Sequence, residues 1–192
     1  MDLERHVAML AEWLDGVDVV TAPARIADAL ERNANRGAVV GLATDVDLRR
    51  LASHEAAHVT IAASTGLRPG RVCIRADGSG SAAYEAIDDD LHSKFAMVLT
   101  HLAGVSFELM CGASGDHARR FGLRHSYDVL AARCDADACR AMGWELGNRA
   151  FATLAICTVA SNLSSIARVA EALRVSGELD GASVMALCGA PQ

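Results

Sequence analysis

The sequence is poor in aromatic residues and has no excess of positive charge. Phe, Trp and Tyr together make up 4% of its 192 residues, whereas hydrophobic residues make up 52%. The core must therefore be built from Ala, Leu, Val and Met, which favours closely packed helices because Ala and Leu are strong helix formers. With 18 Lys and Arg against 24 Asp and Glu, the net charge is −6. This charge argues against nucleic acid as a partner, since binding of a phosphate backbone requires a positive face.

The sequence also lacks a long apolar run, and we expect no secretion signal. Its longest uncharged run, 150–167, contains Thr, Ser and Asn. We predict a core helix there and no membrane span, because a span needs about 20 mostly apolar residues. The first residues do not have the charged, apolar and small-residue order of a signal peptide. None of the six cysteines forms a C-x-x-C pair, so we expect reduced, buried thiols and a cytoplasmic location.

Length and composition predict a single, mainly α-helical domain over 1–192. We divide it into an N-terminal helical extension (1–44), a core that carries the chemistry (45–142) and C-terminal helices (143–192). Apolar residues recur every three or four positions between capping residues and glycines. This pattern predicts helices at 2–14, 24–35, 45–64, 88–111 and 126–142, with two or three more in 143–187. One small β-hairpin is expected at 71–85, around the turn cluster Asp77-Gly78-Ser79-Gly80.

One motif carries specific chemistry, and it is His54-Glu55-Ala56-Ala57-His58. Residues four apart lie on neighbouring turns of one helical face, so the two imidazoles can converge on one metal ion. Glu55 then faces the open side of the metal, where it can accept a proton from water. The motif lies inside a strongly periodic segment, as this geometry requires. The alternative interpretation is a solvent-facing helix with two exposed histidines and a glutamate.

A catalytic zinc needs three protein ligands and one open position, so a third ligand must come from elsewhere in the chain. No E-x-x-x-D pattern follows about 20 residues downstream, and no third histidine follows at a short interval. Spacing alone does not choose among the candidates, which are Glu85, His101, Glu108, Asp116, His117, His125 and Asp128.

Five segments between Leu48 and Leu187 resemble, in order, the peptidase domain of the FtsH family, the zinc proteases normally fused to an AAA ATPase. The segments are RRLASHEAAHV, RPGRVCIRADGSGSAAYE, LAGVSFELMCG, SYDVLAA and SNLSSIARVAEALRVSGELDGASVMAL. They resemble the family's zinc helix, the strand and edge strand that follow it, its Gly-Gly-Arg-Ala-Ala-Glu helix, its Asp-Leu-x-x-Ala-Thr segment and its C-terminal helices. The resemblance implies a compact helical, zincin-like peptidase domain with a small β-hairpin or edge-strand element.

The resemblance also implies roles for individual residues. It makes His54, His58 and Asp128 the ligands of Zn²⁺ and Glu55 the general base. Glu108 falls where the family has a carboxylate that supports a ligating histidine, and metal-bound histidines commonly donate their other N–H to such an acceptor. The alternatives are a helix-stabilising first-turn aspartate at Asp128 and a surface glutamate at Glu108. The edge strand is expected to bind an extended polypeptide substrate through Ser79, Gly80, Ser81, Ala82 and Ala83.

The chain departs from the family at three positions. Ala57 stands in place of a Gly, Val105 in place of an Arg, and Leu109 in place of a second Glu. There is also no G-x-x-x-x-G-K-[ST] motif, so the chain resembles a stand-alone peptidase domain that does not unfold its own substrates. Homo-oligomerisation and a separate ATPase partner are left open.

The sequence therefore predicts a zinc-dependent endopeptidase that hydrolyses unfolded or flexible polypeptides. The departures from the family motivate an alternative of another class, a metal-binding regulatory or interaction domain of the same fold without turnover. A third alternative is a helical adaptor in which the motif is coincidental.

Overall fold

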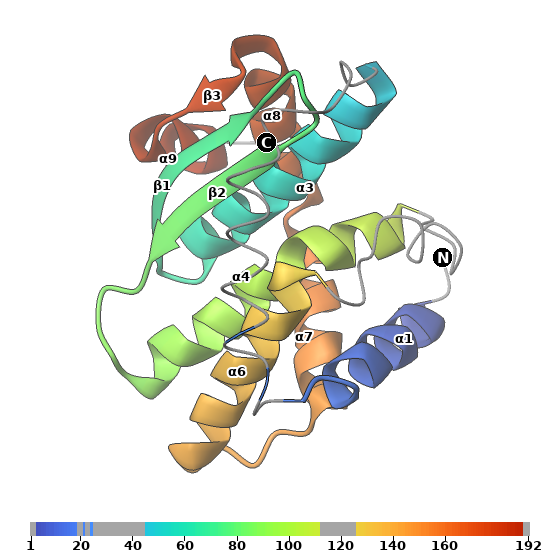
Figure 1. The fold of residues 1–192 in the computed structure, drawn as a ribbon. Coiled ribbons are helices and arrows are strands. Elements are labelled where there is room, and N and C mark those ends of the chain that lie inside the picture. Colours follow the sequence, from blue (N-terminus) through green and yellow to red (C-terminus); the bar gives the residue numbers. More distant parts are fainter. Residues whose placement is uncertain (1–2, 19–20, 22–23, 25–44, 112–125, 190–192) are drawn as a thin grey trace.

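The computed structural model describes residues 3–18, 21, 24, 45–111 and 126–189 (Figure 1). Within them it has seven helices and a three-stranded antiparallel sheet, which confirms a mainly α-helical fold. The predicted helix at 24–35 falls almost entirely outside the described residues. The helices are α1 (Leu3–Asp15), α3 (Asp45–Ser64), α4 (Leu91–Met110), α6 (Tyr127–Ala141), α7 (Asn148–Ser161), α8 (Leu163–Ser176) and α9 (Gly181–Gly189). The strands are β1 (Arg68–Ile74), β2 (Gly80–Glu85) and β3 (Glu178–Leu179).

The ends of the helices follow local signals in the sequence. The Asp90 carboxylate accepts a hydrogen bond from Ser93 N (2.7 Å) at the start of α4. The Ser126 hydroxyl accepts one from Val129 N (3.4 Å) at the start of α6. Both bonds satisfy backbone amides that have no partner within the helix. The end of α8 is set by Gly177, whose φ of 75° a residue with a side chain adopts only at a steric cost.

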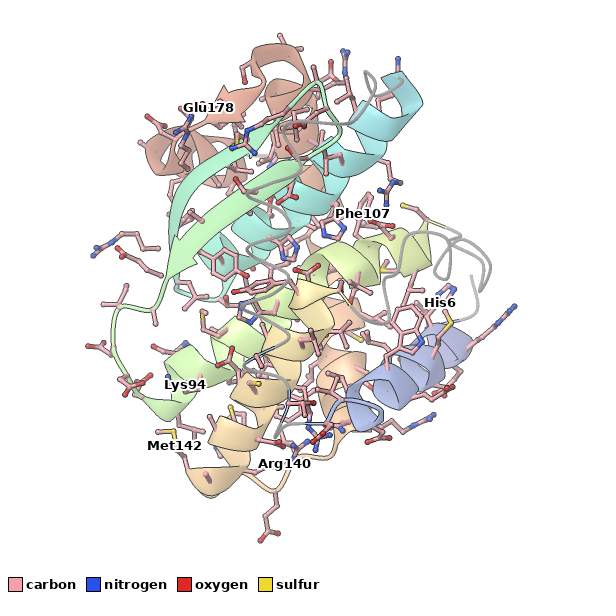
Figure 2. The ribbon with its side chains drawn as sticks, in the orientation of Figure 1. His6, Lys94, Phe107, Arg140, Met142 and Glu178 are labelled. Carbon is pink, nitrogen blue, oxygen red and sulfur yellow. The ribbon has the colours of Figure 1, made fainter. Side chains whose placement is uncertain are left out.

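The sheet is larger than the predicted hairpin. β1 and β2 pair antiparallel as expected, with Cys73 opposite Ser81. β3 adds to the other side of β1, so the strand order is β2-β1-β3. The expectation of a hairpin alone was incomplete, because β3 has only two residues and is too short for a pattern in the sequence to predict it. Glu178 of β3, labelled in Figure 2, forms an ion pair with Arg71 of β1. β1 is thus central, and β2 lies at an edge of the described sheet.

The uncharged run 150–167 does not form the single core helix that we predicted. α7 ends at Ser161, α8 begins at Leu163, and the two helices are bent by 70°. Between them, the Asn162 side chain donates to the Thr158 carbonyl (2.8 Å), and such local bonds compete with helix continuation. Among the described residues, no single helix is long and apolar enough to cross a membrane, although the bent α7–α8 pair meets the criteria of length and composition together.

One hydrophobic core joins the N-terminal helix to the rest of the molecule. Leu10 and Leu14 of α1, Leu102 and Leu109 of α4 and Phe151 of α7 are fully buried in the same cluster. Figure 1 shows α1, α4, α6 and α7 in the lower half and the sheet with α3, α8 and α9 in the upper half. α4 contacts both α3 and α6, and this contact brings the predicted site residues of the three helices together.

The cysteines are partly as expected. All six are free thiols. The expectation that they are buried is confirmed only for Cys73 and Cys139. Cys134 and Cys188 are half-buried, and Cys111 and Cys157 are exposed.

Candidate metal centre

Helices α3 and α6 bring together three side chains of types that can bind a metal ion. His54 and His58 lie one turn apart on α3, with ring centroids 4.9 Å apart. Asp128, in the first turn of α6, places Oδ2 3.2 Å from His54 Nε2 and Oδ1 3.7 Å from His58 Nε2. One ligand atom from each residue lies within 4.8 Å of the other two. His54, His58 and Asp128 therefore form a group that can hold a metal ion.

The second ring nitrogen of each histidine is held by α4. His54 Nδ1 lies 2.6 Å from Glu108 Oε1, and His58 Nδ1 lies 2.7 Å from the Thr100 carbonyl oxygen. A carboxylate and a carbonyl accept hydrogen bonds, so each Nδ1 donates and each Nε2 faces Asp128. Metal-bound histidines have this arrangement, because the outer acceptor fixes the ring and its tautomer. Glu108 is only 4% exposed, so it is not the surface glutamate of the alternative interpretation.

The absence of a side chain at Gly104 keeps space beside the two nitrogens. A Cβ at this position of α4 would lie 2.5 Å from His54 Nε2 and 2.6 Å from His58 Nε2. Both distances are well below van der Waals contact, so a larger residue would fill the space between the two nitrogens that an ion would need. Two imidazoles and a carboxylate also form a donor set that suits Zn²⁺ and related transition metals. The residues present therefore fit a metal ion.

The three candidate ligands differ in charge. Burial lowers the pKa of His58 to about 4, so this ring is neutral at pH 7. Burial acts to raise the pKa of Asp128, but His58 and His54 outweigh it and lower the pKa to about 2. Burial likewise acts to lower the pKa of His54, but hydrogen bonds with Asp128 and Glu108 raise that pKa to about 10. His54 therefore holds a proton that a metal ion has to displace.

Glu55 lies beside this group, against the start of β2. Its side chain is buried, and a Cβ at Gly80 would lie 2.6 Å from Glu55 Oε1. The carboxyl group thus packs directly on the backbone of β2. Burial raises the pKa of Glu55 to about 7, although the charge of His54 acts in the opposite direction. A carboxyl group with this pKa can both accept and donate a proton near neutral pH.

The other candidate ligands do not join the group in the described part of the chain. Glu85 is exposed at the end of β2. His101 is buried, and its Nδ1 lies 3.0 Å from Asp135 Oδ2, close enough for an ion pair but not aligned as a hydrogen bond. Three candidates lie outside the described residues, and they are Asp116, His117 and His125.

The five residues expected to bind substrate lie along one edge. Ser79 belongs to the turn before β2, where its amide donates to Asp77 Oδ1 (2.9 Å). Its four neighbours are the first residues of β2, and their second backbone edge has no strand beside it in the described sheet. These four are Gly80, Ser81, Ala82 and Ala83.

Our reading of the sequence missed two residues that shape the centre. Gly104 was not predicted to have a role at the centre, because the space that it keeps open depends on tertiary packing. Arg50 was not noted at all, yet its Nη1 lies 2.7 Å from Glu108 Oε2. A signal for Arg50 was present, since it stands four residues before His54 and therefore shares its helical face.

No family model matches the chain, and no curated protein matches its sequence significantly. The resemblance to the FtsH family therefore stays a prediction based on the five motif segments. Val105 and Leu109, two of the departures from that family, are fully buried in the hydrophobic core.

Proposed function

We propose that the protein is a zinc-dependent endopeptidase with a zincin-like domain of the FtsH type. The observation that carries the proposal is the convergence of His54 Nε2, His58 Nε2 and the Asp128 carboxylate beside Glu55. Three protein ligands leave one position open on a tetrahedral zinc, which is typical of catalytic sites and not of structural ones. Imidazole ligands also favour Zn²⁺ over Ca²⁺ and Mg²⁺, which prefer oxygen.

The protein residues have separate tasks in hydrolysis. Bound Zn²⁺ supplies Lewis acidity, which polarises the scissile carbonyl and lowers the pKa of water. Glu55 accepts a proton from the attacking water and later donates it to the departing amine as the C–N bond breaks. Its pKa near 7 supports both transfers. Glu108 and Thr100 keep the two histidine rings oriented throughout.

The edge of β2 is the feature that favours a polypeptide as the substrate. An extended peptide can pair with this edge through backbone hydrogen bonds, a common mode of peptide recognition. Because Gly80 touches Glu55, a peptide bound here lies next to the proposed base. This mode requires an extended backbone, so we expect unfolded segments and flexible termini as substrates. A separate ATPase that supplies unfolded chains is compatible with it.

Metal content and cleavage of unfolded casein, measured on the same samples, test this function. We expect one zinc per wild-type chain and cleavage. Asp128→Ala should lose both, because a ligand is removed. Glu55→Gln should keep zinc and lose cleavage by a factor of about 10² to 10⁴, the usual contribution of a general base. Glu85→Gln, at the exposed glutamate of β2, is the matched control and should keep both properties.

Each contradictory outcome points to a different error. A wild-type protein without zinc would refute the metal centre. Cleavage by Glu55→Gln at the wild-type rate would refute the mechanism. Zinc binding without cleavage of any unfolded polypeptide would favour the alternative, a metal-binding regulatory domain, which the substitutions at Val105 and Leu109 motivate.

A further inference from the structure

Both oxygens of the Glu108 carboxylate are engaged by residues of α3. Arg50 Nη1 lies 2.7 Å from Oε2, and His54 Nδ1 lies 2.6 Å from Oε1. Arg50 is one helical turn before His54, so the two side chains approach the carboxylate from the same face of α3. The result is a continuous chain of polar contacts from Arg50 through Glu108 to His54.

We propose that Arg50 is a positioning residue of the metal centre, which fixes the Glu108 carboxylate so that His54 Nε2 stays directed at the metal. The inference rests on the proposed metal centre and adds to it a residue that makes no contact with the metal itself. Arg50 acts on His54 only through Glu108.

The two histidines differ in how much support their acceptors need. The acceptor for His58 is the backbone carbonyl of Thr100, whose position is set by α4. The acceptor for His54 is at the end of a glutamate side chain, and the terminal torsion of such a chain has a broad energy minimum. One hydrogen bond does not fix the plane of that carboxylate, whereas contacts to both oxygens do. Arg50 therefore supplies for His54 what the helix backbone supplies for His58.

Because the Glu108 carboxylate is buried, water cannot readily take the place of Arg50 beside it. The side chain of Glu108 is 3% exposed, against 30% for Arg50. An ionised carboxylate at this depth is costly unless a cation or several donors compensate it. The guanidinium stays charged at every pH of interest and presents directed donors. Removal of Arg50 therefore takes from Glu108 one compensating charge and the contact that holds Oε2, and the carboxylate is then less firmly oriented toward His54.

The guanidinium also repels a bound cation, which opposes the orienting effect. Its repulsion acts across the Glu108 carboxylate, which lies between the two positive groups and offsets much of it. The orienting contacts, in contrast, are short and charge-assisted, the stronger class of hydrogen bond. We therefore expect orientation to dominate, and the sign of the change in metal affinity distinguishes the two effects.

The test is the Zn²⁺ dissociation constant of the full chain, measured by competition with a chelator. Loss of an outer partner of a ligating histidine weakens metal binding by about 10- to 100-fold. We expect about tenfold for Arg50→Met and more for Glu108→Gln. Arg50→Lys should stay within about threefold of wild type, because it restores a cationic donor to one oxygen. Arg49→Met, at the exposed neighbour, is the matched control and should bind like wild type.

A double-mutant cycle shows whether Arg50 acts through Glu108. Arg50→Met combined with Glu108→Gln should bind Zn²⁺ no more weakly than Glu108→Gln alone, because the effects of residues in one chain of contacts are not additive. Full additivity, unchanged affinity in Arg50→Met, or tighter binding would each overturn the inference. Thermal unfolding of the zinc-free variants checks folding, and Arg50→Gln replaces Arg50→Met in the cycle if the latter does not fold. A wild-type protein without zinc affinity would instead refute the metal centre itself.

Discussion

Two polar clusters join helices that are far apart in the sequence, and they differ in how donors and acceptors are matched. At the end of α6, the Arg140 guanidinium, labelled in Figure 2, donates to Asp137 and Asn148. Asn148 in turn donates to Asp15 at the end of α1 (2.6 Å). Each donor there meets an acceptor. At the metal centre, two histidine Nε2 atoms and the Asp128 carboxylate face one another, and all three are potential lone-pair ligands.

This difference separates a structural cluster from a candidate functional one. Buried polar groups are normally paired, and an unpaired one costs free energy of folding. The Arg140 cluster meets that requirement with groups of the protein itself, including the Leu146 carbonyl, and so ties α1, α6 and α7 together. The metal centre meets it only when a cation, either a proton or a metal ion, lies among its ligands. Burial of polar groups therefore indicates function here only when acceptors converge without enough donors.

The largest effect is expected from Gly104→Ala, which fills the space among the converging acceptors. The added Cβ would lie about as close to His54 Nε2 as to His58 Nε2, at 2.5 and 2.6 Å, so both rings have to turn away. We expect Zn²⁺ affinity to fall by at least about 100-fold, because loss of an outer partner alone costs about 10- to 100-fold and here the ligands themselves are displaced. Chelator competition measures it. Alanine also favours a helix by about 1 kcal/mol over glycine, so circular dichroism should still show a folded chain.

A second glycine gives the control for this substitution. Gly147 precedes α7, and a Cβ there meets no atom within 4 Å. Gly147→Ala should therefore bind Zn²⁺ like wild type. Undiminished Zn²⁺ affinity in Gly104→Ala would mean that the ion binds elsewhere. The metal centre would then not differ from the Arg140 cluster in the way we describe.

The Arg140 cluster should show the opposite behaviour. Arg140→Met leaves Asp137 and Asn148 without their shared donor, and we expect it to destabilise the fold by about 2 kcal/mol. Zn²⁺ affinity should change less than twofold, because Arg140 contacts no ligand. Urea unfolding of the zinc-free protein gives the first quantity and chelator competition the second.

The matching control is Arg68→Met. Arg68 forms an exposed ion pair with Glu85, and such pairs contribute about 0–1 kcal/mol. If Arg140→Met lost as much free energy of Zn²⁺ binding as free energy of unfolding, α6 would couple the two clusters. That result would contradict the comparison, which treats the two clusters as independent.

The fold was predictable wherever local signals are strong. The bounds of α3 and the cap at Ser126 followed from periodicity and capping chemistry, which depend on neighbouring residues alone. β3 and the break at Asn162 did not follow. A two-residue strand exists only because β1 is beside it, and an asparagine inside an uncharged run is compatible with either outcome. β3 therefore depends on a contact between segments, and the break depends on a local bond of Asn162; the sequence pattern encodes neither.

The residues of the site also divide into those that local spacing predicts and those that depend on packing between helices. His54 and His58 were predictable because one helix carries both, so their spacing contains the geometry. Asp128 stood among seven candidates, and only the resemblance to a family selected it; the structure now places it beside the two histidines. Arg50 and Gly104 depend on how closely α4 approaches α3. Spacing within one element is therefore readable from the sequence, whereas distance between elements is not.

The smallest expected effect, taken per pH unit, is a pH dependence of Zn²⁺ affinity. Only the metal centre, and not the Arg140 cluster, should depend on pH. In the zinc-free protein His54 is protonated near neutral pH, because its pKa is raised to about 10, whereas His58 is neutral, with a pKa of about 4. One proton must therefore leave for each Zn²⁺ bound, and affinity should rise about tenfold per pH unit between pH 6 and 8. The Arg140 cluster should contribute constant stability over this range, since arginine does not titrate there.

The link between protonation of His54 and stability has a definite sign, which makes this prediction specific. A raised pKa means that His54 holds its proton more tightly in the folded chain than in the unfolded one. Its contribution to zinc-free stability is thus complete below pH 6.5 and is lost as the pH rises through about 10. Zn²⁺ titrations at pH 6, 7 and 8, with calorimetry in buffers of different ionisation enthalpy, count the protons released. A count of zero would mean that His54 is neutral before binding, whereas a count of two would mean that Glu55 also gives up its proton, because it is the other group of the centre with a pKa near this range.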